Sequence, residues 1–507
     1  MVSEPFDSRV YLVGAGPGDP GLMTARAVEL IAAADIIYYD RLIPRGALDG
    51  ARAEAELVYV GKQPGVSGMS QAEINDRLVE SGLEGLRVVR LKGGDPFLFG
   101  RGSEEAAALT GAGIRFEVVP GVTAGVAAPA YAGIPATHRG AASAVAFVTG
   151  HEDPDKPETS LDWAALAAFP GTLAIYMGVG RLSENAAALI DAGRSGDQPV
   201  AVIERGTTPR QRVVTGTLSS ISALAAMAGV ESPALIVVGE VVSCREQLAW
   251  FEDRPLAGLK VVVTRARPGA AALATRLTAL GAEAIELPLI RIEPRLDSPE
   301  LERTIAGIDA YDLVCLSSPN GVELLFEALG SHGLDARALA AARIAAIGPG
   351  TAGALKAHGV RADLIPERSV AEGLIEALGE LRPVPNRVLL ARAAAARPSI
   401  PDSLRRMEID FDDLALYETF AERPDRAALD GLAGADWITF TSGSAAQSLI
   451  EAMPTGLPDG VKLASIGPVT SGVIRAAGLR VDAEAERHDL DGLIEVLLDR
   501  AGRRPAE

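Results

Sequence analysis

The sequence predicts an α/β protein made of several lobes, and three observations support this fold class. Short apolar runs rich in β-branched residues alternate with glycine-containing loops and helical patterns, as in sheets covered by helices. The second half of the chain contains an internal repeat. The chain has 507 residues, 48% hydrophobic and 23% charged, which is long enough for roughly three or four domains or lobes with their own cores.

Residues 8–140 show the strand, loop and helix rhythm most clearly. Each expected strand is a nearly continuous apolar run, which is typical of strands buried on both faces of a parallel sheet. The expected strands are Val10–Val13, Ile36–Tyr39, Leu57–Val60, Val88–Leu91 and Phe116–Val119. The expected helices are Leu22–Ala34, Gln71–Ser81 and Ser103–Gly111.

A polar, proline-containing segment, His151–Ser160, indicates a loop and a lobe boundary. Further strands are expected at Thr172–Met177, Pro199–Ile203, Arg212–Thr215 and Ala234–Val238. Trp250–Gly258 is typical of a linker, and a new strand starts at Val261. We therefore expect one domain over 1–255, with sub-domains at about 8–140 and 141–250, and a second over 256–507.

The second half repeats several of its own segments. Asp312–Leu325 resembles Asp436–Leu449, and Ala345–Glu367 resembles Ala464–Glu486. The segment GLIEAL at Gly373 also returns as GLIEVL, at the same separation as the second pair. Two similar α/β lobes are therefore expected, with a ligand cleft between them. Duplication for stability alone is the alternative.

Composition and charge exclude several classes of protein. The net charge of −19 argues against a nucleic-acid partner. The two cysteines, Cys244 and Cys315, exclude a disulfide scaffold and a cysteine-rich metal site. The N-terminal segment lacks a secretory signal pattern, and no long charge-free apolar stretch predicts a membrane helix. We expect a cytoplasmic protein with no membrane partner.

The first glycine-rich loop, VGAGPGDP at Val13–Pro20, lies between an expected strand and an expected helix. A dinucleotide loop, with Asp40 as the ribose acid, is one interpretation. However, Asp19 replaces the third glycine of that fingerprint, and its carboxylate would oppose a pyrophosphate. It would tolerate a cationic ligand such as S-adenosylmethionine. A structural turn without a ligand is the remaining alternative.

Two further loops follow strands in the same way. Leu91–Glu105 contains Gly-Gly-Asp-Pro, and Pro120–Arg139 places Thr123 at the start of a helix. Thr123 is either a helix cap or a ligand contact. Together the loops indicate that adjacent strand ends share one ligand.

These segments, in this order, resemble the uroporphyrinogen-III C-methyltransferase family, a branch of the tetrapyrrole methylases. The supporting motifs are VGAGPGDPGLMT, YYDRLI, YVGK, VVRLKGGDPFLFGRG, PGVTA, AYAGIPATHR, TGH, IYMG and ERGTTPRQ. The resemblance implies a two-domain α/β fold, S-adenosylmethionine as methyl donor, and a homodimer formed through this half. It also implies methylation of uroporphyrinogen III at C2 and C7, which gives precorrin-2.

The resemblance also implies site residues. Asp40 matches the proton acceptor and Lys62 the proton donor, although Asp40 could instead contact the cofactor ribose and Lys62 a substrate carboxylate. Arg139, beside His138, is expected to line the substrate cleft. No metal is expected, because His138 and His151 lack partners at ligand spacing. The expected cofactor contacts are Pro17, Gly93, Gly94, Asp95, Leu98, Thr123, Ala124, Met177 and Gly206.

Residues 258–498 resemble uroporphyrinogen-III synthase. The motifs are TRARPGAAALATRLTALGAEAIELPLI, LSSPNGVELL, IGPGTAGAL, LALYET, FTSGSAA and IGPVTSGVI. The resemblance implies a bilobal fold, with lobe one at 258–293 plus 420–507 and lobe two at 294–419. The implied reaction closes hydroxymethylbilane into uroporphyrinogen III and inverts ring D. Its product would be the substrate of the first half.

Tyr417 matches the tyrosine of the synthase cleft and is our candidate for assisting hydroxide loss, with a packing role as the alternative. The expected substrate contacts in this half are Arg265, Ser318, Asn320, Arg392, Thr441, Ser442 and Thr470. The segment Cys315–Ser318 departs from the Phe-Thr-Ser-Pro motif that is commoner in the synthase family. Because the substrates are polycarboxylates, arginines including Arg90 and Arg101 are also expected to face the clefts.

Two other functions compete with this interpretation. An NAD-dependent dehydrogenase, as found in some sirohaem enzymes, would need a third domain with its own dinucleotide-binding loop, and no such domain is expected here. A bilobal small-molecule sensor in the second half is the other alternative. The sequence leaves open whether the product serves sirohaem or cobalamin synthesis.

Overall fold

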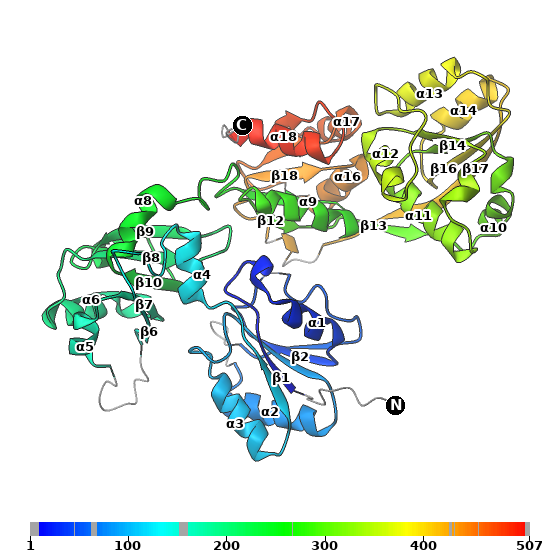
Figure 1. Cartoon of the computed structure of the whole chain (residues 1–507). Coiled ribbons are helices and arrows are strands. Elements are labelled where there is room, and N and C mark those ends of the chain that lie inside the picture. The colour runs from blue at the N-terminus through cyan, green and yellow to red at the C-terminus, as the bar shows by residue number, and fades with distance from the viewer. Residues whose placement is uncertain are drawn as a thin grey trace. The chain divides into compact units, whose positions relative to one another are not determined.

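The computed structural model describes residues 10–44, 46–61, 68–151, 161–265, 267–424, 428–429, 431–454 and 456–501 (Figure 1). The contacts of the chain divide it into two compact units, Met1–Arg254 and Pro255–Glu507. In the described residues, each unit contains two five-stranded sheets. The predicted α/β fold class is confirmed.

The first sheet of the N-terminal unit is parallel, with strand order β3-β2-β4-β1-β5. Tyr11 and Val13 of β1 pack into one core, and Val10 and Leu12 pack into another. Strand β1 is therefore buried on both faces, as predicted, whereas the edge strand β3 is exposed at Glu56 and Leu57. The strands of this sheet are β1 (Val10–Gly14), β2 (Ile36–Tyr39), β3 (Glu56–Tyr59), β4 (Val88–Lys92) and β5 (Phe116–Val119).

Three helices connect these strands: α1 (Ala25–Ala33), α2 (Gln71–Leu83) and α3 (Gly102–Gly111). Helix α1 begins later than predicted because the short 3₁₀ turn η1 (Pro20–Leu22) precedes it and Thr24 caps it, accepting a hydrogen bond from the Ala27 amide. Ser70 and Glu73 form a capping box at the start of α2, which fixes the point where that helix begins.

The second sheet of this unit is mixed, with strand order β6-β7-β10-β8-β9. Its strands are β6 (Val145–Thr149), β7 (Thr172–Tyr176), β8 (Pro199–Glu204), β9 (Arg212–Thr217) and β10 (Ala234–Val238). Strand β6 was not predicted from the sequence. It belongs to the same sheet as β7, so the prediction of a lobe boundary at His151–Ser160 is wrong. Residues 152–160 of that segment lie outside the described part.

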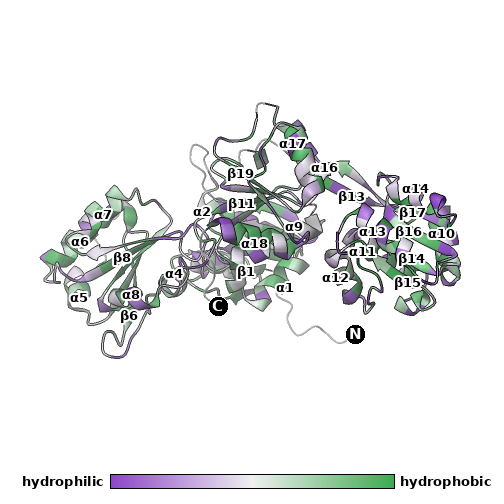
Figure 2. Cartoon of the chain, turned by 90° about the horizontal axis from the view of Figure 1, so that it is seen from above, coloured by the Kyte–Doolittle hydropathy of each residue, from purple (hydrophilic) through white to green (hydrophobic). Residues whose placement is uncertain are grey.

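Short helices accompany the second sheet. They are α4 (Ala124–Tyr131), α5 (Trp163–Ala168), α6 (Leu182–Asp191), α7 (Ile221–Met227) and α8 (Arg245–Leu248), with 3₁₀ turns η2 (Val179–Arg181) and η3 (Glu240–Cys244). Helix α18 (Leu490–Ala501) of the C-terminal unit carries both hydrophobic and hydrophilic residues (Figure 2), as expected of a helix that covers a sheet on one side.

The C-terminal unit contains two lobes, each built on one sheet. The sheet of lobe one is parallel, with order β12-β11-β18-β19-β20. Its strands are β11 (Lys260–Val263), β12 (Glu283–Glu286), β18 (Trp437–Phe440), β19 (Lys462–Ser465) and β20 (Ala483–Glu484). Its helices are α9 (Arg267–Ala279), α16 (Gly443–Ala452), α17 (Pro468–Ala476) and α18 (Leu490–Ala501).

The sheet of lobe two has order β13-β17-β16-β14-β15. Its strands are β13 (Ile290–Pro294), β14 (Leu313–Leu316), β15 (Arg343–Ala346), β16 (Arg387–Ala393) and β17 (Asp410–Ala421). Its helices are α10 (Pro299–Ala306), α11 (Pro319–Ser331), α12 (Pro349–Ala357), α13 (Ala371–Glu380) and α14 (Ser399–Arg406), with 3₁₀ turns η4 (Ile308–Ala310) and η5 (Ala336–Leu339).

None of the helices in the described ranges is long and apolar enough to span a bilayer.

The chain crosses between the two lobes twice, through β13 and through the second half of β17. These crossing strands pair antiparallel with each other, and α16 of lobe one packs against both. Strand β13 follows the carboxyl end of β12, and β17 continues past the carboxyl end of β16. The carboxyl edges of both sheets therefore face the crossing, and the loops at these edges are turned toward the same region.

Candidate active sites

The first candidate site is the carboxyl edge of the parallel sheet in the N-terminal unit. The connections from β1 and from β4 run in opposite directions across the sheet, so a topological switch point lies between these two strands. Ligands bind preferentially at such a point. The first two glycine-rich loops meet there, because the Gly94 amide donates to the Gly16 carbonyl at 2.7 Å and the Gly16 amide donates to the Gly94 carbonyl at 3.2 Å.

The glycines at this edge fall into two groups. A Cβ on Gly121 would lie 2.2 Å from the Gly94 carbonyl oxygen, and one on Gly14 would lie 2.5 Å from the Gly121 amide. These two glycines allow the three loops to pack together. Gly94 is different, because its φ of +69° favours glycine while the space around a Cβ there is open to 4 Å. Its backbone is accessible to a ligand, which fits a cofactor held by close backbone contact.

Asp95 and Thr123 tie the neighbouring loops together. The Asp95 carboxylate accepts from the Phe97 amide at 2.8 Å and from the Gly121 amide at 3.1 Å. Thr123 forms no capping hydrogen bond although it begins α4, so its predicted alternative as a helix cap is wrong. The Thr123 hydroxyl forms a hydrogen bond with the hydroxyl of Tyr176, which ends β7 in the second sub-domain of the same unit. Burial raises the pKa of the Tyr176 phenol, which therefore stays neutral.

Strained backbone gathers in the loops around this edge. Six described non-glycine residues have positive φ, and five of them are in loops that follow β4, β7 and β8. Met177 is one, and it leaves 53% of its surface exposed after β7. Gly206 stands between two others, and a Cβ there would lie 2.4 Å from that of Ala128 in α4. Three other predicted cofactor contacts are half-buried: Pro17 follows β1, Leu98 follows β4, and Ala124 begins α4.

Asp19 has a different role from the one the sequence suggested. One carboxylate oxygen accepts from the Gly21 amide at 2.7 Å, and the other accepts from the Tyr131 hydroxyl at 2.7 Å. Its amide also donates to Thr207 Oγ1, at 3.1 Å. Burial and the Asp19 hydrogen bond raise the pKa of Tyr131. Both carboxylate oxygens thus accept hydrogen bonds from protein donors. Asp19 joins the first loop to the second sub-domain of the N-terminal unit.

Asp40, the candidate proton acceptor, follows β2 at the same edge. Its side chain is 25% exposed and accepts from the Leu42 amide at 3.1 Å and from Arg90 at 3.4 Å. Asp40, Tyr39 and Tyr59 contribute to the lining of a hollow of about 500 Å³. Lys62, its predicted partner, lies outside the described residues. Arg139 is exposed in the loop before β6.

A buried charge cluster lies behind Asp40. Glu105 of α3 is completely buried, and its Oε1 accepts from Arg90 at 3.0 Å and from Lys92 at 2.8 Å. Burial, followed by the nearby Arg90 charge, lowers the pKa of Lys92. The expectation that Arg90 faces a substrate cleft is wrong, because this guanidinium is 3% exposed and is committed to Glu105 and Asp40. Arg101 is exposed and binds Glu104.

In the C-terminal unit, lobe one presents polar groups at the carboxyl ends of β11, β18 and β19. Ser442 caps α16 by accepting from the Ala445 amide at 3.2 Å, and Thr441 precedes it. Thr470 is buried in the first turn of α17. Arg265 follows β11 and makes no recorded hydrogen bond or ion pair among the described residues. Burial lowers the pKa of this guanidinium.

Lobe two presents Ser318 and Tyr417 at its carboxyl edge. The Ser318 hydroxyl caps α11 by accepting from the Gly321 amide at 3.0 Å, and it lies 2.9 Å from the Tyr417 hydroxyl. Burial raises the pKa of Tyr417 against an opposing effect of the Ser318 hydrogen bond. The Tyr417 ring also belongs to the hydrophobic core of lobe two, so its geometry is compatible with both predicted roles. Asn320 is half-buried in the first turn of α11.

The segment VVVTRARPG from Val261 resembles VLLARAAAA from Val388, which makes Arg392 the counterpart of Arg265. Arg392 is bound within its own lobe. Its Nε and Nη2 donate to the two Asp413 oxygens at 2.6 Å each, and its Nη1 donates to the Arg397 carbonyl at 2.8 Å. All three guanidinium nitrogens of Arg392 therefore already donate to groups of the same lobe, two of them in a bidentate pair with Asp413. The two arginines therefore differ, since Arg265 keeps its donors available and Arg392 does not.

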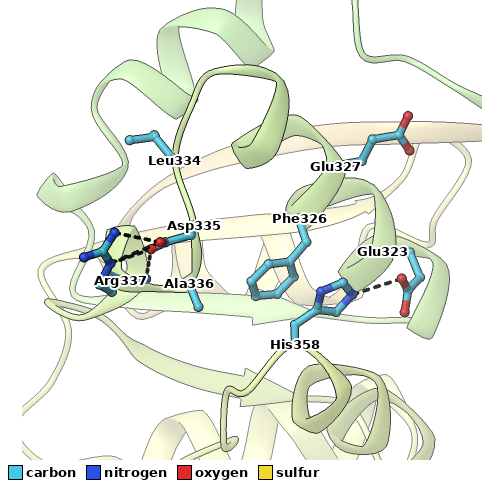
Figure 3. A pocket seen from close by; sticks show the side chains of 8 residues that line it. All are labelled: Glu323, Phe326, Glu327, Leu334, Asp335, Ala336, Arg337 and His358. Carbon is cyan, nitrogen blue, oxygen red and sulfur yellow. Dashed lines mark hydrogen bonds and ion pairs between the residues drawn. The ribbon is translucent and has the colours of Figure 1, made fainter. Parts of the chain in front are cut away.

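A separate hollow of about 680 Å³ lies on lobe two (Figure 3). In it, the rings of Phe326 and His358 stack at 4.2 Å, and His358 bonds Glu323 at 3.0 Å. His358 stands at the C-terminal end of α12, whereas the loop that follows β15 stands at its N-terminal end. This hollow is therefore remote from the predicted ligand loops.

The folds and these edges define two α/β small-molecule enzymes in one chain, and comparison with known proteins identifies them. Residues 9–222 match the tetrapyrrole (corrin/porphyrin) methylases, and residues 271–495 match uroporphyrinogen-III synthase HemD. The chain is 39% identical over 500 residues to the porphyrin biosynthesis protein HemD of Ruminiclostridium josui, covering 97% of this chain and 98% of that protein.

Two further relatives cover the N-terminal unit. The S-adenosyl-L-methionine-dependent uroporphyrinogen III methyltransferase of Methanosarcina barkeri is 55% identical over 240 residues, which are 47% of this chain and 94% of that protein. The solved uroporphyrin III C-methyl transferase of Thermus thermophilus is 41% identical, with a TM-score of 0.41, over 46% of this chain and 99% of that one. The chain belongs to both families, as a fusion of a uroporphyrinogen-III C-methyltransferase with a uroporphyrinogen-III synthase.

Proposed function

We propose that the two units catalyse consecutive reactions. Residues 256–507 close hydroxymethylbilane into uroporphyrinogen III with inversion of ring D. Residues 1–255 then methylate C2 and C7 of that product and give precorrin-2. The observation that carries the proposal is that one chain matches two enzyme families, a uroporphyrinogen-III synthase and a methyltransferase whose relative is named for acting on uroporphyrinogen III.

S-adenosylmethionine supplies the electrophilic methyl group when it is bound. The proposed binding residues are those of the three joined loops, with the accessible Gly94 backbone at the centre. Met177 and Gly206 contribute from the second sub-domain of the same unit. The open space beside Gly94 and the strained loops around it support this assignment. Homodimerisation through the same unit stays a prediction.

Methylation of a pyrrole carbon leaves a cationic ring, from which a proton must depart. Asp40 is proposed to accept this proton, since its carboxylate is partly exposed at the sheet edge and lines a hollow. The Leu42 amide and the Arg90 guanidinium orient the carboxylate through its two oxygens. Lys62 remains the proposed donor.

In the synthase reaction, hydroxide must leave the hydroxymethyl carbon. The terminal pyrrole must then form a bond to that carbon through its own substituted position. Tyr417 is proposed to donate the proton, with Ser318 fixing the orientation of its hydroxyl. Because burial raises its pKa, Tyr417 keeps its proton at neutral pH. Arg265, with available donors, is proposed to bind substrate carboxylates together with Thr441, Ser442 and Thr470.

The test treats each unit with its own substrate. Hydroxymethylbilane alone should yield uroporphyrinogen III, and uroporphyrinogen III with S-adenosylmethionine should yield a doubly methylated product. A bilobal sensor would instead leave hydroxymethylbilane to close spontaneously to the type I isomer. Only type I product from hydroxymethylbilane would therefore contradict the synthase assignment.

A further inference from the structure

The two IGP loops of the synthase repeat are covered by different residues. In lobe two, a Cβ on Gly348 would lie 2.5 Å from Ser369 Oγ. In lobe one, a Cβ on Gly467 would lie 2.8 Å from Cδ2 and 3.3 Å from Nε2 of His488. Ser369 and His488 occupy equivalent places in the repeat. An imidazole has therefore replaced a hydroxymethyl group against one of two otherwise similar loops.

The edge of the His488 ring that carries Nε2 lies against the Gly467 loop. The side chain is half-buried, and no hydrogen bond or ion pair of it is recorded within the described ranges. A half-buried imidazole whose N–H group has no protein partner keeps that group available to water or to a ligand. His488 is therefore held by the Gly467 loop with its donor uncommitted.

The surroundings of His488 favour an anionic partner. Gly467 stands directly before α17, a nine-residue helix whose first amides lack intrahelical partners. Thr470, in the first turn, is 4% exposed, and its hydroxyl has no recorded partner in the part of the chain that the structure describes. Arg265 follows β11, with β18 between that strand and β19, and is likewise without a recorded partner in the described residues. These donors lie at the carboxyl edge of one sheet, and they favour carboxylate groups as ligands at that edge.

The corresponding groups of lobe two are less available. Arg392 is held by Asp413 and the Arg397 carbonyl, and Ser369 takes the place of the imidazole. Lobe two instead presents Tyr417 and Ser318. The repeat has therefore diverged, with uncommitted cationic and N–H groups on lobe one and a buried phenol on lobe two.

We propose that His488 is a further substrate-binding residue of the synthase, donating a hydrogen bond to a carboxylate of the linear tetrapyrrole beside Thr470 and the start of α17. This inference rests on the proposed synthase function. Lobe one holds the carboxylate side chains of the substrate, and lobe two acts on the carbon where the ring closes.

The test compares His488→Ala and His488→Gln with Ser369→Ala, the matched change at the equivalent position of lobe two. With hydroxymethylbilane as substrate, His488→Ala should raise KM by roughly ten- to a hundred-fold, as expected for losing a hydrogen bond to a charged group, and should change kcat little. His488→Gln should recover part of the loss because its amide can donate. Ser369→Ala should behave as wild type.

A second variant displaces the imidazole without removing it. Gly467→Ala places a methyl group in the position that lies 2.8 Å from the His488 ring, so it should raise KM in the same direction. Thermal unfolding checks that each variant is folded. A wild-type KM in His488→Ala, or a loss confined to kcat, would overturn the binding role. If the wild-type chain forms no uroporphyrinogen III at all, the proposed function itself fails and this inference fails with it.

Discussion

Replacing Tyr417 by phenylalanine separates its two predicted roles. The change keeps the ring in the core of lobe two and removes only the hydroxyl, which lies 2.9 Å from Ser318 Oγ. Ser318 Oγ keeps its hydrogen bond from the Gly321 amide, so the serine oxygen retains a partner in the variant. The cost in unfolding free energy should therefore stay near the about 0.5–1.5 kcal/mol of one hydrogen bond.

The effect on catalysis should be larger than the effect on stability. If the hydroxyl donates the proton to the leaving hydroxide, its loss should slow kcat by roughly 10²–10⁴-fold. We expect the lower end of this range, because water or a substrate carboxylate can also donate. Burial raises the pKa of the phenol, so the wild-type rate should persist beyond a pH of about 10, where an exposed tyrosine would lose its proton.

The assay follows the ratio of type I to type III uroporphyrinogen at fixed enzyme and limiting time. Slower enzymatic closure leaves more hydroxymethylbilane to close without inversion, so the ratio should shift toward type I. Methylation of added uroporphyrinogen III by the same chain serves as the control and should be unchanged. Wild-type rate and ratio in the variant would reduce Tyr417 to a packing residue.

Three other predictions concern the N-terminal unit and the junction. Glu105→Ala should lower the unfolding free energy by about 3–5 kcal/mol because it leaves Arg90 and Lys92 buried without their carboxylate, and a denaturant midpoint unchanged from wild type would disprove this. Asp19→Gly should weaken S-adenosylmethionine binding by up to about tenfold, through loss of the Tyr131 and Gly21 contacts that hold the first loop, whereas equal affinity in calorimetry would remove this role. Fragments cut between Arg254 and Pro255 should each keep their own reaction, and inactivity of both would contradict the two-enzyme organisation.

The periodicity of the sequence predicted the parts of the fold that local pattern controls. The five strands of the first sheet agree with the structure to within one residue at each end, because each is marked by an apolar run, although the edge strand β3 is exposed at Glu56 and Leu57. The internal repeat likewise predicted the paired lobes. Strand β6 was missed, since VAFVT stands close to a glycine-rich turn without a strong boundary of its own.

The sequence could not show which charges are already paired. Arg90 and Arg392 looked like free cations, but their partners Glu105 and Asp413 come from other elements and are identified only by packing. Asp19 looked like a ligand-facing acid for the same reason, because Tyr131 lies far along the chain. His488 was missed although the repeat contained its signal, namely a histidine where the equivalent position holds serine.

The most direct test of the account combines both reactions in one vessel. Purified full-length chain is incubated with hydroxymethylbilane and S-adenosylmethionine carrying a trideuterated methyl group, and the macrocycle is analysed by mass spectrometry. We expect a single product that carries two labelled methyl groups and derives from the type III isomer. Unlabelled type I macrocycle as the only product would contradict the central claim that this chain makes uroporphyrinogen III and then methylates it twice.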